Sequence, residues 1–182
     1  MGDNQNLYEV AITQIPGIGP QLTRQLVSYC GSPHGVFHAP PGKLQKIPGI
    51  GPAAFKNFTQ GAKQGLIQAE ELLKKAKEHD VQLLFYTSPK FPDRLKQIAD
   101  APTLLYFRGN GNLNQRRIIS IVGTRQVSNY GQAITERIVA DLAPYNVLIV
   151  SGLAYGVDII AHRAAIQAGL PTIGVMASGP DV

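Results

Sequence analysis

The sequence lacks three features that would each indicate a different class of protein. No stretch approaches the roughly 18 consecutive apolar residues of a membrane-spanning helix, so we expect no membrane-embedded segment. The first ten residues contain no basic segment followed by an apolar run, so we expect no secretory signal. Cys30 is the single cysteine, which excludes an intrachain disulfide and makes a reducing, cytoplasmic location the expectation.

Charge is also sparse and unevenly distributed. Only 16% of the 182 residues are charged, with 17 Lys+Arg against 12 Asp+Glu and a formal net charge of +5. The 44% of hydrophobic residues is typical of a globular protein, and the length allows one large domain or two small ones. Residues 118–182 contain three basic and four acidic residues and no lysine. The positive excess is therefore weak evidence for nucleic acid on its own.

One hexapeptide occurs twice in the first half of the chain. IPGIGP occupies residues 15–20 and again residues 47–52, an offset of 32 residues. Apolar residues one helical turn apart follow each copy. Each Gly-x-Gly allows a tight backbone turn, and the proline that follows suits the start of a helix. The sequence therefore predicts a helix–hairpin–helix unit used twice.

This doubled unit resembles the tandem helix-hairpin-helix, SAM-like domains of DNA-handling proteins, over about residues 7–66. In that family the backbone N–H groups of the hairpin face a phosphate. The resemblance nominates Gly17, Gly19, Gly49 and Gly51, with Lys46 and Lys56 as nearby charges. The alternative is a compact helical bundle in which the glycines serve only turns and packing. Basic residues are sparse after the hairpins, so this alternative is slightly favoured.

The helical region is predicted to end in a charged surface helix. Residues 68–78 place glutamates one turn before lysines, which favours a solvated helix that closes a domain at residues 1–78. Two apolar strands are expected at 81–86 and 103–107, with a proline-started helix between them at 91–98. These strands would begin a second domain, residues 79–182.

From residue 118 the pattern changes to alternating strands and helices. Strands are expected at 118–122, 147–150 and 172–176, and helices at 130–142 and 157–168. The first helix carries Ile134, Ile138 and Leu142 on one face. This alternation predicts a parallel sheet with right-handed crossovers, and ligands bind such sheets beyond the carboxyl ends of the strands.

The loops at those strand ends combine small residues with one arginine. GTRQVS (123–128) follows the first strand, SGLAYG (151–156) the second and ASG (177–179) the third. Small residues let backbone N–H groups approach an anion, and the planar fork of Arg125 suits phosphate. Neither of the first two loops is GxGxxG, so no dinucleotide cofactor is expected. Tyr130 and Tyr155 either stack on bases or pack against the sheet.

The pattern VGTRxxSxYG at residues 122–131, followed by SGxAxGxDxxAH at 151–162, resembles the DNA processing protein A (DprA, also called Smf) family. The lead-in at residues 91–109 is similar to the same family, so the resemblance covers nearly the whole chain. It implies an α/β protein with an N-terminal all-helical SAM-like domain followed by a Rossmann-like parallel sheet. The chain departs from the family by ending at residue 182, so the sheet is expected to be C-terminally truncated.

The resemblance implies a binding protein rather than an enzyme. The family binds single-stranded DNA through its Rossmann-like domain, protects it and loads RecA recombinase onto it during natural transformation. Its members commonly form homodimers through that domain in the full-length protein, and no cofactor is implied. Carried over residue by residue, the expected DNA-binding positions are Gly123, Thr124, Arg125, Ser128, Ser151, Gly152 and Gly156.

Two clusters of polar residues suggest other chemistry. Asp158 and His162 lie one turn apart on a predicted helix, but no nucleophile is paired with them, so helix stabilisation and a structural hydrogen bond are favoured over catalysis. His34 and His38 are four residues apart in a proline- and glycine-rich stretch that is expected to interrupt any helix. Because a third ligand of suitable spacing is missing, no metal site is expected.

The main alternative function is the binding or hydrolysis of a nucleotide-derived small molecule. The same loops would hold one phosphate of such a ligand. The doubled hairpin argues against this alternative, because a small-molecule enzyme has little use for a tandem module of the DNA-binding type.

Overall fold

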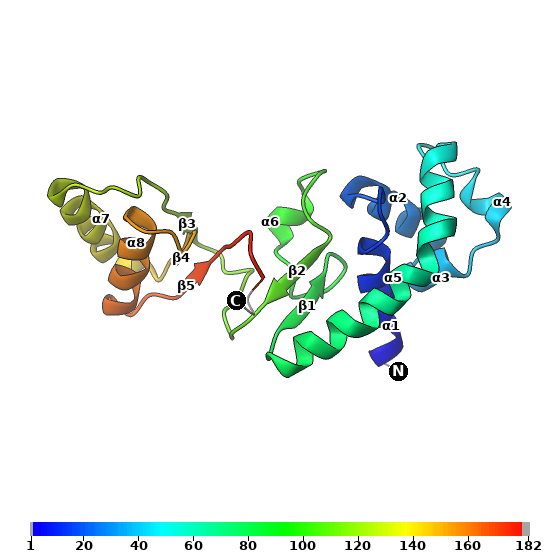
Figure 1. The fold of residues 1–182 in the computed structure, drawn as a ribbon. Coiled ribbons are helices and arrows are strands. Elements are labelled where there is room, and N and C mark those ends of the chain that lie inside the picture. Colours follow the sequence, from blue (N-terminus) through cyan, green and yellow to red (C-terminus); the bar gives the residue numbers. More distant parts are fainter. Residues whose placement is uncertain (1, 180–182) are drawn as a thin grey trace. The chain divides into compact units, whose positions relative to one another are not determined.

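The computed structural model describes residues 2–179, and the chain forms two compact units, residues 1–108 and residues 109–182 (Figure 1). The expected boundary between residues 78 and 79 falls at the end of helix α5 (Pro52–Glu78). The first compact unit extends further, because strands β1 (Gln82–Phe85) and β2 (Leu104–Phe107) pack against the helices that precede them. No helix within residues 2–179 combines the length and apolarity that crossing a membrane requires.

Within residues 2–179 five helices precede the first strand, and two of them begin at the prolines of the repeat. Helix α2 begins at Pro20 and α5 at Pro52, each after a glycine in extended conformation, as the repeat predicts. Helix α5 has 27 residues and includes the charged segment 68–78 as its last part. Figure 1 shows that α5 bends along its length. The other helices are α1 (Gly2–Thr13), α3 (Pro33–Phe37) and α4 (Pro41–Leu44).

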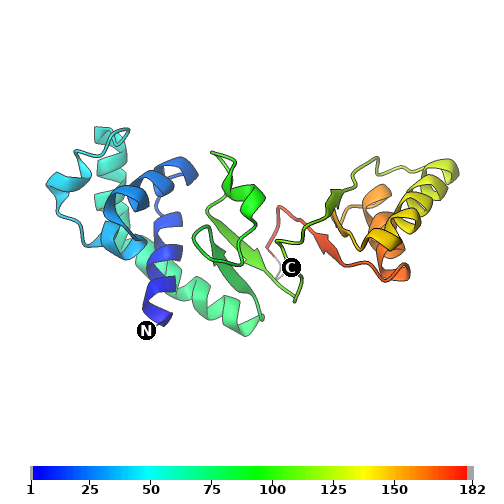
Figure 2. The ribbon, with the colours of Figure 1, turned by 180° about the vertical axis from the view of Figure 1, so that it is seen from behind.

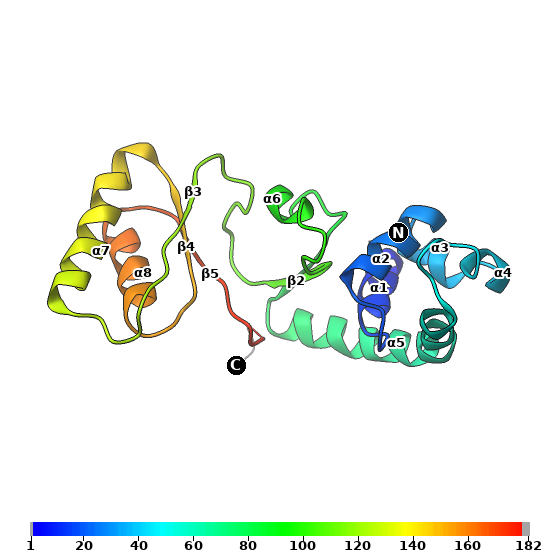
Figure 3. The same ribbon diagram turned by 90° about the horizontal axis from the view of Figure 1, so that it is seen from above.

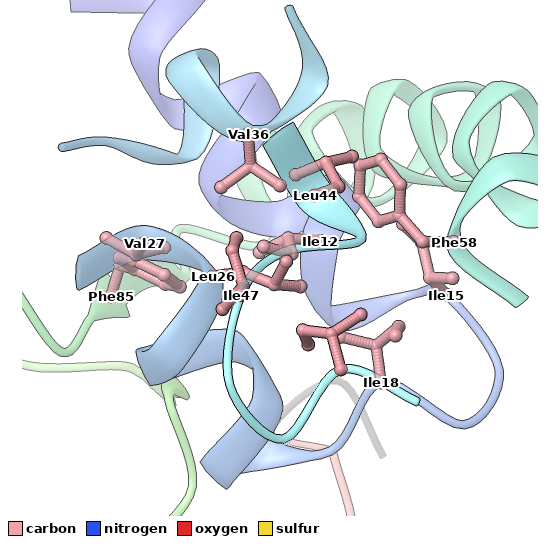
Figure 4. Close-up of a cluster of buried hydrophobic side chains, with 11 residues drawn as sticks. Ile12, Ile15, Ile18, Leu26, Val27, Val36, Leu44, Ile47, Phe58 and Phe85 are labelled. Carbon is pink, nitrogen blue, oxygen red and sulfur yellow. The ribbon is translucent and has the colours of Figure 1, made fainter. Parts of the chain in front are cut away.

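The two copies of the repeat contribute equivalent positions to one core. Ile15 and Ile47 are both buried, as are Ile18 and Ile50, and Leu26 matches Phe58 in the same way. Figure 4 shows that side chains from both copies gather in this core, among them Ile15, Ile18 and Ile47. Both copies of the repeat therefore contribute to a single shared core. The whole cluster consists of Ile12, Ile15, Ile18, Leu26, Val27, Val36, Leu44, Ile47, Ile50, Phe58 and Phe85.

The expectation that no helix forms around His34 and His38 is wrong. Pro33 occupies the first turn of α3, where a missing N–H costs nothing, and Ser32 caps that turn by accepting a hydrogen bond from the Gly35 N–H at 3.0 Å. The two imidazole rings stack with their centroids 4.0 Å apart. Within residues 2–179 no group of three or more His, Cys, Asp or Glu side chains is placed to hold a metal ion.

Strands β1 and β2 form an antiparallel pair, with a short helix between them. Gln82 pairs with Phe107 and Phe85 with Leu104, and α6 (Asp93–Lys96) lies in the connection. Arg24 of α2 donates hydrogen bonds to the Lys96 and Ala101 carbonyl oxygens at 3.4 and 3.2 Å. This arginine therefore fastens the hairpin helix to the β1–α6–β2 segment.

The second unit is a parallel sheet with its helices on one face. Strands β3 (Ile118–Ser120), β4 (Leu148–Ser151) and β5 (Thr172–Gly174) are neighbours in that order. Helices α7 (Asn129–Leu142) and α8 (Val157–Gln167) make the two crossovers and pack against each other. Figures 2 and 3 show both helices on the same side of the three strands. The core between them consists of Val139, Val147, Ile149, Ala161, Ala164, Ala165 and Leu170.

Helix α7 turns to the core a face that only partly matches the expected one: Leu142 packs against the core, but Ile138 does not. Thr135 and Val139 are buried, whereas Ile138 is 49% exposed. Thr135 can be buried because its hydroxyl donates to the Gly131 carbonyl oxygen at 2.8 Å, which satisfies its polar atom. The expected end of the truncated sheet includes residues 180–182, which lie outside the described residues.

Candidate nucleic-acid interface

The loop after β3 and the loop after β4 are held against each other by backbone contacts at the carboxyl edge of the sheet. The Val157 N–H donates to the Thr124 carbonyl oxygen at 3.1 Å. Gly156 has φ 86° and ψ −131°, and a Cβ atom there would lie 2.7 Å from the Arg125 Cα. Only glycine fits this backbone conformation and this close approach. Gly156 therefore positions Arg125 rather than presenting a functional group of its own.

Gly123 has a similar packing role. A Cβ atom at Gly123 would lie 2.6 Å from Cγ2 of Val157, at the start of α8. Thr124 shapes the same loop, because its hydroxyl oxygen accepts a hydrogen bond from the Gln126 N–H at 3.2 Å. The side chain of Arg125 is exposed, and within residues 2–179 it forms no ion pair or hydrogen bond. Arg125 is thus an exposed cation on a fixed stretch of backbone, and it is available to an anion.

The N-terminus of α8 is not available to an anion in the same way. The N–H of Val157 already bonds to Thr124, and Asp158 lies in the first turn of the helix with 8% of its surface exposed. Its carboxylate faces Gly152, where an added Cβ atom would lie 2.7 Å from Oδ2. A carboxylate in the first turn compensates the positive end of the helix dipole. This part of the edge therefore offers no uncompensated positive charge to a phosphate.

The N-terminus of α7 offers a better anion site next to Arg125. Ser128 caps the helix by accepting a hydrogen bond from the Gly131 N–H at 3.1 Å, so its own hydroxyl proton stays available. The first turn of α7 contains no acidic residue. The N–H groups of the first turn have no partner within a helix. The structure thus places Ser128, the first turn of α7 and Arg125 on one loop and helix start.

The hydroxyl proton of Ser151, unlike that of Ser128, is already used in a hydrogen bond. Its side chain is buried, and its hydroxyl donates to the Ile121 carbonyl oxygen at 2.5 Å. A hydroxyl has a single proton to donate, so Ser151 has none for a phosphate in this arrangement. Ser151 links β4 to the end of β3 and thereby holds the two loops in register. A direct contact between Ser151 and DNA remains a prediction.

The two tyrosines of the site do not pack against the sheet. Tyr155, in the loop after β4, is 86% exposed, and Tyr130, in the first turn of α7, is 76% exposed. Of the two readings left open by the sequence, packing is therefore excluded for both side chains. Exposed Val122 and Leu153 follow β3 and β4 and extend this apolar edge. Sequence reasoning did not nominate them, although each is an apolar residue two positions after the end of a strand.

Asp158 and His162 belong to the interior of the unit. His162 is 4% exposed, and its Nδ1 lies 2.6 Å from Oγ1 of Thr172. Because Thr172 gives its only proton to the Ile149 carbonyl oxygen, Nδ1 of His162 must carry the proton of that contact. Burial lowers the pKa of His162, and the Asp158 carboxylate partly opposes that shift. These features fit the structural role that the sequence favours.

The hairpin glycines fall into two pairs. Gly17 and Gly49 have positive φ, 76° and 80°, and each faces a side chain from the helix that follows the other hairpin. That side chain is Asn57 for Gly17 and Gln25 for Gly49, and Gln25 Nε2 also donates to the Pro48 carbonyl oxygen. Gly19 and Gly51, in contrast, cap their helices with no neighbouring atom within 4 Å of an added Cβ. The first pair is explained by packing, and DNA contact by the hairpins remains a prediction.

Comparison with known proteins adds two matches to sequence families. Residues 82–182 match the family described as DNA recombination-mediator protein A, and residues 9–63 match the SAM-like helix-hairpin-helix tandem. The first match covers more than half of the chain. The combination of a tandem hairpin domain with an α/β domain agrees with the fold expected from the sequence.

Several individual proteins are similar to this chain. Protein Smf of a Synechocystis species is 27% identical over 186 residues, covering 100% of this chain and 46% of that protein. DNA processing protein DprA of Streptococcus pneumoniae is 41% identical over 92 residues, covering 50% of this chain and 32% of its own length. The X-ray structure of that organism's DprA has a TM-score of 0.71 at 28% identity, covering 97% of this chain and 59% of the other. The chain thus spans less than half the length of these two curated relatives.

Proposed function

Because this chain belongs to the DNA recombination-mediator protein A family, we propose that it takes part in DNA processing during recombination, as a binding protein for single-stranded DNA and not as an enzyme. The relatives named DNA processing protein supply the general role. The single-strand preference, the absence of catalysis and the partners named below are our proposal.

One observation carries the proposal: Arg125 is an exposed guanidinium whose backbone is fixed by Gly156 and by the bond from Val157 to Thr124. A guanidinium binds a phosphate through two parallel hydrogen bonds, and a fixed backbone limits the positions that the side chain of Arg125 can reach. The N-terminus of α7 lies on the same loop and adds donors of the same kind. We therefore place one backbone phosphate of the DNA between Arg125 and the first turn of α7.

The remaining predicted positions would act mainly through the shape of the site. Gly123 and Gly156 bring the two loops together, Ser151 joins the strands, and Thr124 turns the loop. Gly152 lies beside the Asp158 carboxylate, which would steer a phosphate toward Arg125. The burial of Asp158 and His162 supports a binding role over a catalytic one, because neither side chain is open to a substrate.

The proposal extends to partners and location. Protection of incoming DNA and delivery of that DNA to RecA recombinase would follow strand binding, and homodimers of the full-length protein would present two such sites. The single cysteine fits a cytoplasmic location for this activity.

The test is binding of fluorescent oligothymidine to this chain, followed by anisotropy over a salt series. We expect Arg125→Ala to weaken binding and to flatten the dependence on salt, since each phosphate contact with a single strand contributes a slope of about −0.7. Arg163→Ala is the matched control, because Arg163 is exposed in the middle of α8 and away from the loops. Equal affinities of the wild type and Arg125→Ala would refute this assignment of the site. Equal competition by mononucleotides would instead favour a small-molecule ligand.

A further inference from the structure

The carboxyl edge of the sheet in the second unit has little positive charge for a surface that binds DNA. In residues 109–182 the arginines are Arg116, Arg117, Arg125, Arg137 and Arg163, and there is no lysine. Arg116 and Arg117 precede β3 and thus lie at the amino end of the sheet, whereas Arg137 and Arg163 lie within helices. Arg125 alone follows a strand at the carboxyl edge. A single phosphate contact makes a small contribution to affinity, so the edge must bind through other groups.

The other groups on this edge are exposed and apolar. Tyr155 is 86% exposed and directly precedes Gly156, whose backbone touches that of Arg125. Exposed Val122 precedes the Arg125 loop, and exposed Leu153 lies in the same loop as Tyr155. An exposed tyrosine ring on a loop whose backbone adjoins that of Arg125 can hold a nucleobase while the arginine holds a neighbouring phosphate.

We propose that Tyr155 is a base-stacking platform that makes this site selective for unpaired nucleobases, an inference that rests on the proposed function. The rings of a duplex are stacked on their neighbours and paired, so they cannot cover an isolated tyrosine face. A single strand offers such a face at every nucleotide. Arg125 contributes charge and position, and Tyr155 distinguishes a strand with bases from a bare sugar–phosphate chain.

The chain provides a matched control for this role. Tyr145 is 56% exposed and lies in the 3-10 turn η1 (Ala143–Tyr145), which precedes β4. It is therefore at the amino edge of the same sheet, opposite to Tyr155. A non-specific effect of removing a surface tyrosine would appear equally at both positions.

The experiment compares two probes of equal length and equal phosphate number: oligothymidine and a fully abasic strand. Each is titrated with the wild type and with the variants Tyr155→Ala, Tyr155→Phe, Tyr145→Ala and Arg125→Ala. Stacking on one aromatic ring changes affinity by about 5-fold or more, so the wild type should prefer oligothymidine by at least that factor. Tyr155→Ala should bring the ratio of the two dissociation constants close to one. Tyr155→Phe should keep the ratio, since a phenyl ring retains the stacking face. Tyr145→Ala should also keep it, because Tyr145 lies at the opposite edge of the sheet.

Arg125→Ala separates this inference from the proposed function. It should weaken binding of both strands by the same factor and leave their ratio unchanged. Binding with a ratio that Tyr155→Ala does not alter would overturn the platform and leave the proposed function standing. Absence of binding to both probes would overturn the proposed function and the platform with it. Self-association of the chain that Tyr155→Ala abolishes, with the ratio unchanged, would identify the edge as a protein interface and refute the inference.

Discussion

The guanidinium of Arg24 lies 4.9 Å from the centroid of the Tyr86 ring, so a basic residue of the first hairpin helix is turned toward the β1–β2 pair. Burial raises the pKa of Tyr86, and the charge of Arg24 partly opposes that rise. Because Arg24 is also bonded to two carbonyl oxygens, it is committed to packing between elements. The exposed lysines near the hairpins, Lys43, Lys46 and Lys56, all adjoin the second copy. The two hairpins are thus alike in backbone and different in charge.

Replacement of Arg24 by alanine should lower the free energy of unfolding by about 2 kcal/mol, because hydrogen bonds from a charged donor and a partly desolvated cation–π contact are both lost. The midpoint of urea unfolding measures this change. Arg137→Ala is the control: Arg137 forms only an exposed pair with Asp141 at 3.8 Å, and its loss should cost no more than about 0.5 kcal/mol. Similar shifts for both variants would contradict the anchoring role of Arg24.

Alanine at the hairpin glycines should separate packing from DNA contact. Gly17→Ala and Gly49→Ala should each cost about 1 kcal/mol or more, because both positions have positive φ and meet a side chain of the other copy. Gly19→Ala and Gly51→Ala should each cost only about 0.5 kcal/mol, since alanine is a poorer N-cap than glycine but open space surrounds both positions. Chemical denaturation measures the free energy of unfolding of all four variants.

The second pair of these glycine variants also tests the hairpins as DNA contacts. If the hairpin N–H groups bind phosphate, Gly51→Ala should weaken duplex binding without unfolding the chain. Gly19→Ala should weaken it less, because no lysines adjoin the first hairpin. Unchanged binding by a stable Gly51→Ala variant would leave the hairpins a purely structural role.

Gly156→Ala should disrupt the candidate site itself. The added Cβ would meet the Arg125 backbone at 2.7 Å in a conformation that alanine avoids. We therefore expect the free energy of unfolding to fall by about 2–3 kcal/mol and the binding of single strands to be lost. Gly169→Ala is the control, because Gly169 also has positive φ, 68°, but no atom lies within 4 Å of its added Cβ. It should cost about 1 kcal/mol and leave binding intact. Thermal unfolding and anisotropy together distinguish the two variants.

His162 should make stability depend on pH on the acidic side. Burial lowers its pKa in the folded state below the ordinary value of 6.5, so below that pH the unfolded chain binds more protons than the folded chain. The contribution of His162 is therefore complete above about pH 6.5 and is lost as the pH falls toward the folded-state pKa. The slope from this one group cannot exceed about 1.4 kcal/mol per pH unit.

The measurement is urea unfolding at a series of pH values for the wild type and His162→Gln. The variant keeps a polar side chain at the position but cannot titrate, so its stability should vary less over this range. Identical pH profiles for the two proteins would contradict a buried neutral histidine.

Several features could be predicted from the sequence because they depend on neighbouring residues. The repeat at 15–20 and 47–52 specified two helix starts at Pro20 and Pro52, since proline and glycine constrain the backbone locally. The alternation after residue 118 indicated three parallel strands and two crossover helices, because the spacing of apolar residues along the chain differs between strands and helices. Element ends were less accurate, as for β3, which ends at Ser120.

Other features depended on contacts between distant residues. Proline and glycine around His34 predicted that no helix forms there, but the N-cap from Ser32 allows a short helix. The periodicity of α7 suggested Ile138 as a core residue, whereas the packing of α8 selects Thr135 and Val139. Sequence alone could not separate Ser128 from Ser151, because the difference is whether the hydroxyl proton is already bonded.

The sequence by itself thus determined the family, the order of the elements and the choice of Arg125, because these follow from local backbone preferences and from motifs along the chain. The tertiary structure decided which of the nominated groups are available to a ligand. Arg125 and Tyr155 are both exposed, on two loops whose backbones meet at Gly156, while Arg24, Asp158 and His162 are buried or bonded within the fold. Availability depends on burial and on the partner of each polar atom, and both arise from residues far apart in the chain.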